Sequence, residues 1–403
     1  MINLKILIIH HFCGIGGGFK SCLDIAKMIK NNGHDVTIAL PSLNSEVESV
    51  LKKNKIKYRI DIPAIIEFNY HSASSTAFVA LIKYFISLRN RNKWRSFFAE
   101  QNYDLIILNS LVQAPLIKYI KEAKKKSILF IRETIRKNRK TILNKFLSRK
   151  IVEFDAISFL TKYDQESWGI KKGVIQEIIP DIVDIQCLSI EYTELQNRKV
   201  ELNIHENTPC FLYLGGLCYI KGALDVLLAF NRYLALGNKG HLFMLGSDYN
   251  KFSELGCIKK IIHMKDIRYS QYCKRVIKAI NNNGNNITFV GLVEQPEDWY
   301  LISDIVIFPV KKVHQARPIY EAGFFKKTVI VPRFPNFSES VIENYNGLYY
   351  MPGNIEDLSE KMIDLAKNRK KRNELGKHNM ELYEQIHTFK YAETKLNKML
   401  DKL

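Results

Sequence analysis

The sequence predicts an α/β protein of two domains, each a Rossmann-like, doubly wound parallel sheet covered by helices. Three observations predict this fold. The chain has 403 residues, 46% of them hydrophobic, which suits two domains of about 200 residues better than one core. Short apolar runs alternate with stretches of helical spacing, as in parallel sheets. The alternation stops near residue 181 and starts again at residue 210.

The first half begins with a β-α-β pattern. An apolar run at Leu4–His10 leads into a glycine-rich turn, a helix-like stretch at Ser21–Asn31 and a second apolar run at Val36–Leu40. Further strands are predicted at Leu105–Leu108, Ser127–Ile131 and Ala156–Leu160.

A charged, weakly apolar stretch at residues 191–208 is interpreted as a linker. It separates an N-terminal domain (1–185) from a C-terminal domain (186–382). The second half then repeats the pattern, with predicted strands Cys210–Leu214, His241–Leu245, Ile287–Val290, Ile305–Phe308 and Thr328–Val331, and helices Ala223–Leu236, around Lys274–Asn281 and from about Pro318. Residues 368–403 are predicted to be helical throughout. We expect 383–403 to pack back on the N-terminal domain.

The glycine loop at residues 14–18 follows the first strand and opens a helix. Bare backbone amides at a helix N-terminus can face a phosphate or a sugar, so Gly16, Gly17 and Gly18 are candidate binding residues. The spacing is not the dinucleotide fingerprint G-x-G-x-x-G. A structural tight turn explains these glycines equally well.

A second loop carries Gly215, Gly216, Lys221 and Gly222 to the start of a helix. A lysine in this place can neutralise a diphosphate leaving group, and Gly222 allows a ligand to approach closely. The alternative is an exposed lysine near a turn.

A third candidate segment runs from His314 to Gly323. Pro318 suits the first turn of a helix, which places Arg317 at the N-terminal end and Glu321 one turn inside. The arginine fork and free amides there form an anion site, and Glu321 could accept both hydroxyls of a ribose. The alternative is an i, i+4 ion pair of Arg317 and Glu321 on a solvated helix.

The order of these segments carries a family resemblance. The series consists of the glycine loop, residues 179–184 (Ile-Pro-Asp-Ile-Val-Asp), Gly-Gly-Leu with Lys221-Gly222, Phe289-Val290-Gly291, residues 303–309, Glu321-Ala322 and Asn346-Gly347-Leu348. This series resembles the retaining GT-B glycosyltransferases of family 4, which include many polysaccharide and lipopolysaccharide assembly enzymes. The resemblance covers nearly the whole chain and is specific in the C-terminal half. It implies the GT-B architecture, in which two Rossmann-like domains face a central cleft.

The resemblance also implies roles for individual residues. Lys221 matches the lysine that contacts the donor diphosphate, and Glu321 matches the second glutamate of the E-x7-E motif, which holds the nucleotide ribose. Gly291 and Val293 match the segment beside the base. The backbone that faces the phosphates is matched by Ile319, Tyr320 and the turn before them.

Two positions depart from the family pattern. Gly216 stands where an arginine often follows the first glycine of the lysine-bearing loop, and Val313 stands where the first glutamate lies near the donor sugar. Donor recognition therefore cannot follow the family's commonest arrangement. Arg317 or His314 could restore a charge-assisted contact to phosphate or sugar.

In the N-terminal half, Arg132 and Glu133 end a predicted strand where the family often has a cleft histidine. They are acceptor-side or catalytic candidates. A local ion pair is the alternative.

The net charge of +19 is unevenly distributed, because residues 81–150 hold 18 Lys or Arg against 4 Asp or Glu. Aromatic residues lie among the basic ones, namely Tyr84, Phe85, Trp94, Phe97 and Phe98. Such a stretch fits an anionic membrane surface, although a solvated basic face is also compatible with it. Nucleic acid is not expected as a partner, because the sequence contains no recognised nucleic-acid-binding module.

The longest apolar stretch, Ala77–Leu88, is well short of the roughly 20 residues that a spanning helix needs. The N-terminus has no signal-peptide pattern, so we expect a cytoplasmic protein that is peripheral on the inner face of the plasma membrane. The seven cysteines contain no C-x-x-C pair and no histidine at metal-ligand spacing. No disulfide, metal or cofactor is expected.

The implied reaction transfers a hexose or related sugar from a nucleoside diphosphate, of the UDP or GDP type, to a hydroxyl of a lipid-linked saccharide. The anomeric configuration is retained, and the pathway is cell-surface polysaccharide synthesis. The candidate catalytic residues are Lys221, Arg317, Glu321 and Arg132. The alternatives are a catalytically silent nucleotide-sugar-binding protein, which the departures at Gly216 and Val313 would allow, and a GT-B-fold nucleotide-sugar epimerase.

Overall fold

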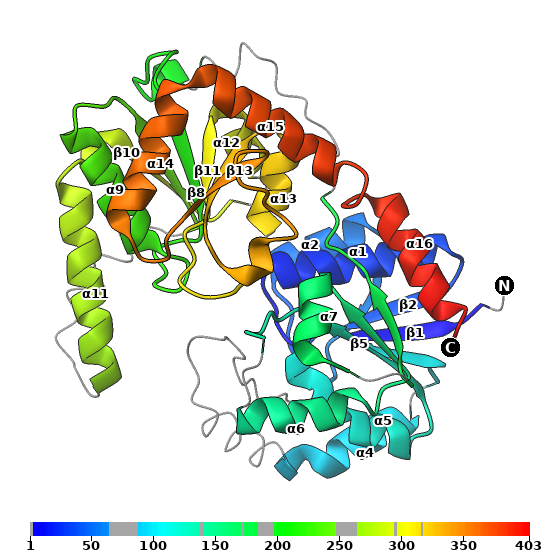
Figure 1. Ribbon diagram of the computed structural model, residues 1–403. Helices are drawn as coiled ribbons and strands as arrows, with labels where there is room; N and C mark the ends of the chain where they lie inside the picture. The colour runs from blue at the N-terminus through cyan, green and yellow to red at the C-terminus, as the bar shows by residue number, and fades with distance from the viewer. Residues whose placement is uncertain are drawn as a thin grey trace. The chain divides into compact units, whose positions relative to one another are not determined.

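The computed structural model describes residues 3–63, 88–100, 102–137, 141–170, 173–183, 197, 199–246, 264–293, 296–315 and 317–403. The chain divides into two compact units. Unit 1 comprises Met1–Asp184 and Ile386–Leu403, and unit 2 comprises Ile185–Gln385. Each unit is an α/β layer structure with one parallel sheet (Figure 1).

The sheet of unit 1 has, within the described residues, seven parallel strands in the order β3-β2-β1-β4-β5-β6-β7. The strands are β1 (Lys5–Ile9), β2 (Asp35–Ala39), β3 (Lys57–Arg59), β4 (Leu105–Leu108), β5 (Lys126–Ile131), β6 (Ala156–Phe159) and β7 (Ile175–Ile178). In register, Ile8 pairs with Ile38 of β2 on one side and Ile107 of β4 on the other. The strand order reverses between β1 and β4, which is the topological switch point of a doubly wound sheet.

Helices cover both faces of this sheet because its central strands are apolar on both faces. On β1, Ile6 and Ile8 pack into the core under one helical layer, while Leu7 and Ile9 pack into the core under the other. The first layer contains α1 (Gly17–Asn31), α2 (Ser45–Lys53) and α16 (Phe389–Leu400). The second contains α4 (Arg91–Glu100), η2 (Leu111–Leu116), α5 (Ile117–Glu122), α6 (Ile142–Ile151) and α7 (Lys162–Trp168). The short helix η1 (Leu88–Asn90) precedes α4 and contacts it.

The sheet of unit 2 has six parallel strands in the described part of the chain, in the order β10-β9-β8-β11-β12-β13. They are β8 (Cys210–Leu214), β9 (His241–Leu245), β10 (Ile287–Gly291), β11 (Ile305–Ile307), β12 (Thr328–Pro332) and β13 (Gly347–Tyr350). The switch point lies between β8 and β11. The helices are α9 (Ala223–Ala235), α11 (Met264–Asn281), η3 (Gly284–Asn286), α12 (Glu297–Ile302), α13 (Arg317–Phe324), η4 (Pro335–Phe337), α14 (Ile355–Lys367) and α15 (Arg369–Tyr383).

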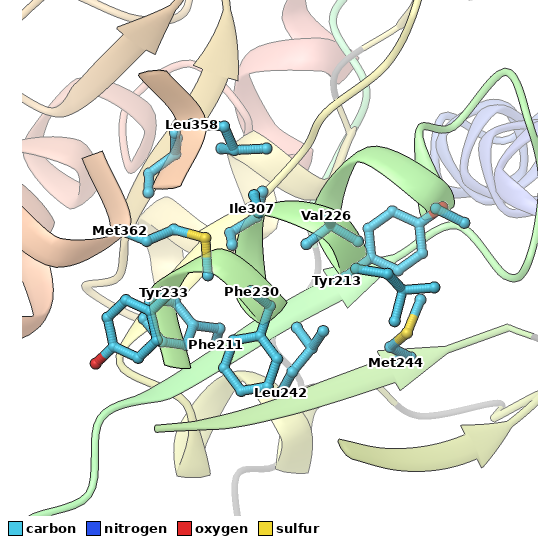
Figure 2. Packing of buried hydrophobic residues seen from close by; sticks show 14 of the residues in the cluster. Phe211, Tyr213, Val226, Phe230, Tyr233, Leu242, Met244, Ile307, Leu358 and Met362 are labelled. Carbon is cyan, nitrogen blue, oxygen red and sulfur yellow. The ribbon is translucent and has the colours of Figure 1, made fainter. Parts of the chain in front are cut away.

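The main core of unit 2 lies between β8 and the helices α9, α11 and α14, and Figure 2 shows its centre. Alternate residues of β8, Phe211 and Tyr213, point toward α9. The Phe211 ring meets Tyr233 edge-on, with centroids 5.2 Å apart. Met362 of α14 belongs to the same cluster of buried side chains. This packing fixes the carboxyl end of β8, from which the Lys221 loop emerges.

The predicted fold class is confirmed, but two details of the sequence interpretation are wrong. Residues 368–403 are not one helix, because α15 ends at Tyr383 and α16 begins at Phe389. The break has a physical cause within unit 1: His387 O accepts a 3.0 Å hydrogen bond from Val183 N, and the Thr388 side chain caps α16. α15 packs on α13 and β12, whereas α16 packs on α1 and β7. The linker predicted at 191–208 lies partly outside the described residues.

The second correction concerns the aromatic residues of the basic stretch. Trp94, Phe97 and Phe98 are not at the surface, since all three are buried in the core under α4. Tyr84 and Phe85 lie outside the described residues. Over the part of the chain that the structure describes, no helix combines the length and the apolar character needed to cross a membrane.

Candidate active site

The loops after β8 and β11 meet at the switch point of unit 2, where doubly wound sheets place their ligands. The first loop carries Lys221 and the second carries His314. Lys221 Nζ is in direct contact with His314 Nε2. Lys221 Nζ also lies 5.6 Å from the centroid of the Phe308 ring, which is nearly parallel to the His314 ring. Lys221 and His314, which are 93 positions apart in the sequence, therefore lie next to the same aromatic ring, that of Phe308.

Burial lowers the pKa of Lys221 to about 8, and the Cys218 thiol opposes this shift. The lysine is therefore poised between its charged and neutral forms at mildly alkaline pH. The main chain of His314 is also held, since Asn336 Nδ2 donates a 2.9 Å hydrogen bond to its carbonyl oxygen. The protonation of such a pair would respond strongly to a nearby anion, because an anion favours the charged form of a base.

Two polar contacts and a glycine join these loops. Lys311 N donates to Ile220 O at 2.9 Å, and Lys311 Nζ pairs with Asp225 Oδ1 at 2.7 Å. Gly222 has a φ of +79°, and a Cβ there would lie 1.9 Å from Pro309 O. Only glycine fits this position without moving the backbone. The close approach seen at Gly222 is that of the other loop, and the prediction that it allows a ligand to approach stays a prediction.

The other predicted glycines of unit 2 bring together the ends of three strands. Gly216 N donates to Leu245 O at 2.8 Å, and Gly246 N donates to Gly291 O at 2.6 Å. A Cβ on Gly215 would lie 2.7 Å from Lys221 Cβ. Gly216, where the family often has arginine, has a φ of +59°, a conformation that favours glycine. Val293 follows β10 and is partly exposed.

Arg317 and Glu321 form the predicted pair on α13, and Pro318 lies in the first turn of that helix. Arg317 Nε lies 2.9 Å from Glu321 Oε1, and the two side chains are only 16% and 14% exposed. The pair is thus not on a solvated face. The side chains of Ile319 and Tyr320 are buried, so a ligand could meet only their backbone.

Sequence reasoning missed Tyr300, whose hydroxyl donates a 2.8 Å hydrogen bond to Glu321 Oε2. No rule of residue spacing could find Tyr300, because the contact joins two helices, α12 and α13, that β11 separates in the sequence. Val313, at the position of the family's first glutamate, is buried and apolar. The departure from the motif is therefore a real loss of a carboxylate at that point.

Unit 1 holds a second polar cluster, around Arg132. Its Nη1 atom lies 3.2 Å from Asp181 Oδ1, and Nε donates to Asn109 Oδ1 at 3.2 Å. Ser21 Oγ also contacts Asp181. Arg132 therefore pairs with Asp181 rather than with its neighbour Glu133. The side chains of the pair are 11% and 10% exposed, and burial lowers the pKa of Arg132.

Glu133 instead accepts backbone hydrogen bonds. Its Oε2 atom receives the amides of Leu111 and Arg132, each at 3.0 Å, and Ser110 Oγ contacts Oε1. Burial raises the pKa of Glu133. This carboxyl group organises the loops after β4 and β5.

The glycine loop is connected to Arg132 through Asn109. Asn109 Nδ2 donates to Gly18 O at 3.0 Å and lies 3.2 Å from His10 Nδ1. Gly16 is the N-cap of α1 and offers no side chain to the first amides, while Gly17 and Gly18 are exposed. The amide of Gly16 donates to Gly14 O at 3.0 Å, and the binding role of this loop stays a prediction.

His10, Asn109 and Asp181 were not predicted as site residues, although each lies shortly after the end of a strand of unit 1. His10 and Asn109 directly follow β1 and β4, the two strands of the switch point. Polar residues at these two positions were the signal that could have found them.

The predicted site residues form two groups. In unit 2, Lys221 and His314 are in contact, Arg317 and Glu321 are paired, and Gly215, Gly216, Gly222 and Gly291 shape the loops around them. In unit 1, Gly18 and Arg132 share Asn109. Across the described residues, no three His, Cys, Asp or Glu side chains gather in a way that could hold a metal ion.

Comparisons with known proteins show which family and which solved structures the chain is similar to. The family model described as glycosyl transferases group 1 matches residues 196–381, a range that includes the Lys221 loop and α13. No curated protein matches the chain by sequence. A glycosyltransferase from Rickettsia africae ESF-5 has 17% identity and a TM-score of 0.73, covering 99% of this chain and 98% of that one.

Two further solved structures are similar over their whole length. Anabaena HepE, in complex with UDP and glucose, has 14% identity, a TM-score of 0.76 and full coverage of both chains. The sucrose-phosphate synthase of Thermosynechococcus elongatus has 15% identity, a TM-score of 0.71 and 99% coverage of both. These likenesses show a shared GT-B fold. Residues 196–381 match the glycosyl transferases group 1 family, and on this match the chain is a glycosyltransferase of the retaining, nucleotide-sugar-dependent type.

Proposed function

We propose that this enzyme transfers a hexose from a UDP- or GDP-sugar to a hydroxyl of a lipid-linked saccharide, in cell-surface polysaccharide synthesis. The observation that carries the donor assignment is the convergence of Lys221 and His314 at the switch point of unit 2. Two nitrogen bases at that point can meet the diphosphate of a nucleotide sugar. α13 begins three residues after His314 and adds its N-terminal amides.

The residues of unit 2 divide the work between the parts of the donor. Lys221 neutralises charge that develops on the diphosphate as the sugar leaves, and His314 is the second donor to the same oxygens. Glu321 accepts the ribose hydroxyls, and Arg317 and Tyr300 hold its carboxylate in place. Gly291 and Val293 lie beside the base. No side-chain nucleophile is needed for this chemistry.

In unit 1, we assign Arg132 and the glycine loop at Gly16–Gly18 to the sugar and acceptor side. Their shared partner Asn109 keeps them in register with each other. A UDP-sugar is the first donor to test, since HepE has been solved with UDP and glucose.

A basic surface supports a membrane-linked acceptor. α4, α5 and α6 expose Arg91, Lys93, Lys118, Lys121, Lys145 and Arg149. Ile142, at the start of α6, is 70% exposed on the same helix as Lys145 and Arg149. Basic side chains around an exposed apolar residue suit the headgroup region of anionic lipids. Trp94, Phe97 and Phe98 do not contribute to membrane binding as aromatic anchors, because their side chains are buried.

The donor assignment is tested by thermal shift with UDP-, GDP-, ADP- and dTDP-sugars. We expect one nucleotide to raise the melting temperature of the wild type, and Lys221→Ala and Glu321→Ala to weaken that rise. Lys370→Ala, which removes a highly exposed lysine of α15, is the matched control. A rise that survives both site substitutions would place the donor elsewhere.

The acceptor side is tested by co-sedimentation with vesicles containing phosphatidylglycerol. We expect binding at low salt and its loss at high salt, because surface charges are screened. Lys145→Glu with Arg149→Glu should weaken binding, while Lys370→Glu with Lys377→Glu on α15 should not. Binding that ignores salt, or no binding, would favour an acceptor that is not at a membrane.

A further inference from the structure

We propose that Lys221 and His314 act as one diphosphate site whose occupation is coupled to the uptake of a proton by the pair. This inference rests on the donor site proposed above. It adds a property that neither residue would have alone.

The contact itself limits the charge of the pair. When Lys221 Nζ and His314 Nε2 touch, one nitrogen must donate a hydrogen and the other must accept it. An ammonium group can donate to a neutral imidazole, an imidazolium can donate to a neutral amine, and two neutral bases can also share the hydrogen bond. The pair therefore carries at most one positive charge, because two charges would repel across the same contact.

The geometry keeps the two groups together. Phe308 lies under both, and Asn336 of η4 holds the main chain of His314. The loop of Lys221 is tied to the loop of His314 through Ile220 O and Lys311 N. The main chains that carry the two side chains are therefore fixed next to each other.

Within the described residues, two carboxylates on the adjoining elements are paired with other cations. On α9, Asp225 is matched by Lys311 of the loop after β11. On α13, Glu321 is matched by Arg317. Each of these carboxylates thus has a cation of its own.

On its own loop, Lys221 faces the Cys218 thiol, which raises its pKa slightly. Burial has the larger effect and lowers the pKa of Lys221 to about 8. A diphosphate within a few ångströms favours the charged form of both bases. Binding should therefore convert a singly charged pair into a doubly charged one.

The test is isothermal titration with UDP-glucose and GDP-glucose near pH 7, in buffers that differ in ionisation enthalpy. In both probes one phosphate is esterified by the nucleoside and the other by the sugar. The charge of the free probe therefore stays constant near pH 7. We expect the wild type to take up about one proton per ligand bound. His314→Asn and His314→Gln should take up almost none, since Lys221 alone is already mostly protonated near pH 7.

Two further variants sharpen the test. Lys221→Arg should keep the uptake, because a fixed cation remains beside a titratable His314. His378→Asn, on the exposed face of α15, should behave like the wild type.

The outcomes separate this inference from the donor site. Tight binding with an enthalpy that does not depend on the buffer would leave the donor site intact and overturn the coupling. Uptake that persists in both His314 variants would also overturn it. Failure of both nucleotide sugars to bind would refute the donor site, and the coupling with it.

Discussion

The hydroxyl of Tyr300 donates a 2.8 Å hydrogen bond to Oε2 of Glu321, and the other oxygen of that carboxylate is paired with Arg317 at 2.9 Å. Both oxygens are thus fixed by groups on two helices. Each keeps a further lone pair, which under the proposed function accepts a hydroxyl of the donor's ribose. The carboxylate that the family motif predicts is therefore held in advance of binding.

Tyr300→Phe should weaken binding of the donor by about fivefold to tenfold, which corresponds to roughly 1 kcal/mol for one lost hydrogen bond. The fold should persist, because the stacking of residue 300 on Phe325 needs only the ring. Titration calorimetry with the donor measures the change. Tyr391→Phe, on α16 of unit 1, is the control, and equal affinity of Tyr300→Phe and wild type would contradict the role of the hydroxyl.

Gly222→Ala should destabilise unit 2 by more than about 2 kcal/mol, because the new Cβ adds a backbone collision to the strain of a positive φ. Gly237→Ala is a matched control, since Gly237 has a φ of +80° and open space around the Cβ position. It should cost only about 1 kcal/mol, the strain alone. Urea unfolding measures both, and equal losses would show that the two loops do not meet as closely as described.

The central strands and the edge strand β10 could be predicted from the sequence, but the edge strands β3 and β7 of unit 1 could not. β4, with the sequence Leu-Ile-Ile-Leu, is buried on both faces and has a clear apolar signal. β3 is Lys-Tyr-Arg and β7 is Ile-Gln-Glu-Ile, because edge strands face water and carry polar residues. These two edge strands therefore lack the apolar pattern on which the prediction depends.

The site was predictable where a motif is local along the chain. Lys221 and Glu321 each belong to such a motif, but the contacts of Tyr300 and Asn109 depend on which strands are neighbours. Strand order cannot be deduced from local sequence, so Tyr300 and Asn109 were missed. The surface error at Trp94, Phe97 and Phe98 was avoidable, since a spacing of i, i+3 and i+4 is typical of a buried helix face.

Arg132→Ala should lower the free energy of unfolding by about 3 kcal/mol or more, because it leaves Asp181 without its cation in a largely buried place. Asp181→Asn should also destabilise, and the double variant should lose less than the sum of the two. A double-mutant cycle by urea unfolding measures this coupling. The exposed pair of Lys57 and Asp35 should show a much smaller coupling, and additive losses at Arg132 and Asp181 would contradict a direct interaction.

His10 should make the protein less stable in acid. Burial, followed by the charges of His11 and Arg132, lowers its pKa from 6.5 to about 3 in the folded protein. Below pH 6.5 the unfolded chain binds a proton at His10 that the folded protein does not. The stability that neutral His10 contributes is therefore complete above pH 6.5 and is lost as the pH falls toward 3.

Between pH 7 and pH 5 this single group should reduce the free energy of unfolding by about 2 kcal/mol. His10→Gln removes the titration, so its stability should fall less steeply over the same range, whatever its stability at pH 7. His11, whose pKa burial lowers to about 4, should leave a residual slope in that variant. His378→Asn, which removes an exposed histidine, should retain the full wild-type slope. Urea unfolding at both pH values compares the three proteins, and a His10→Gln slope equal to that of the wild type would show that His10 can be protonated without unfolding.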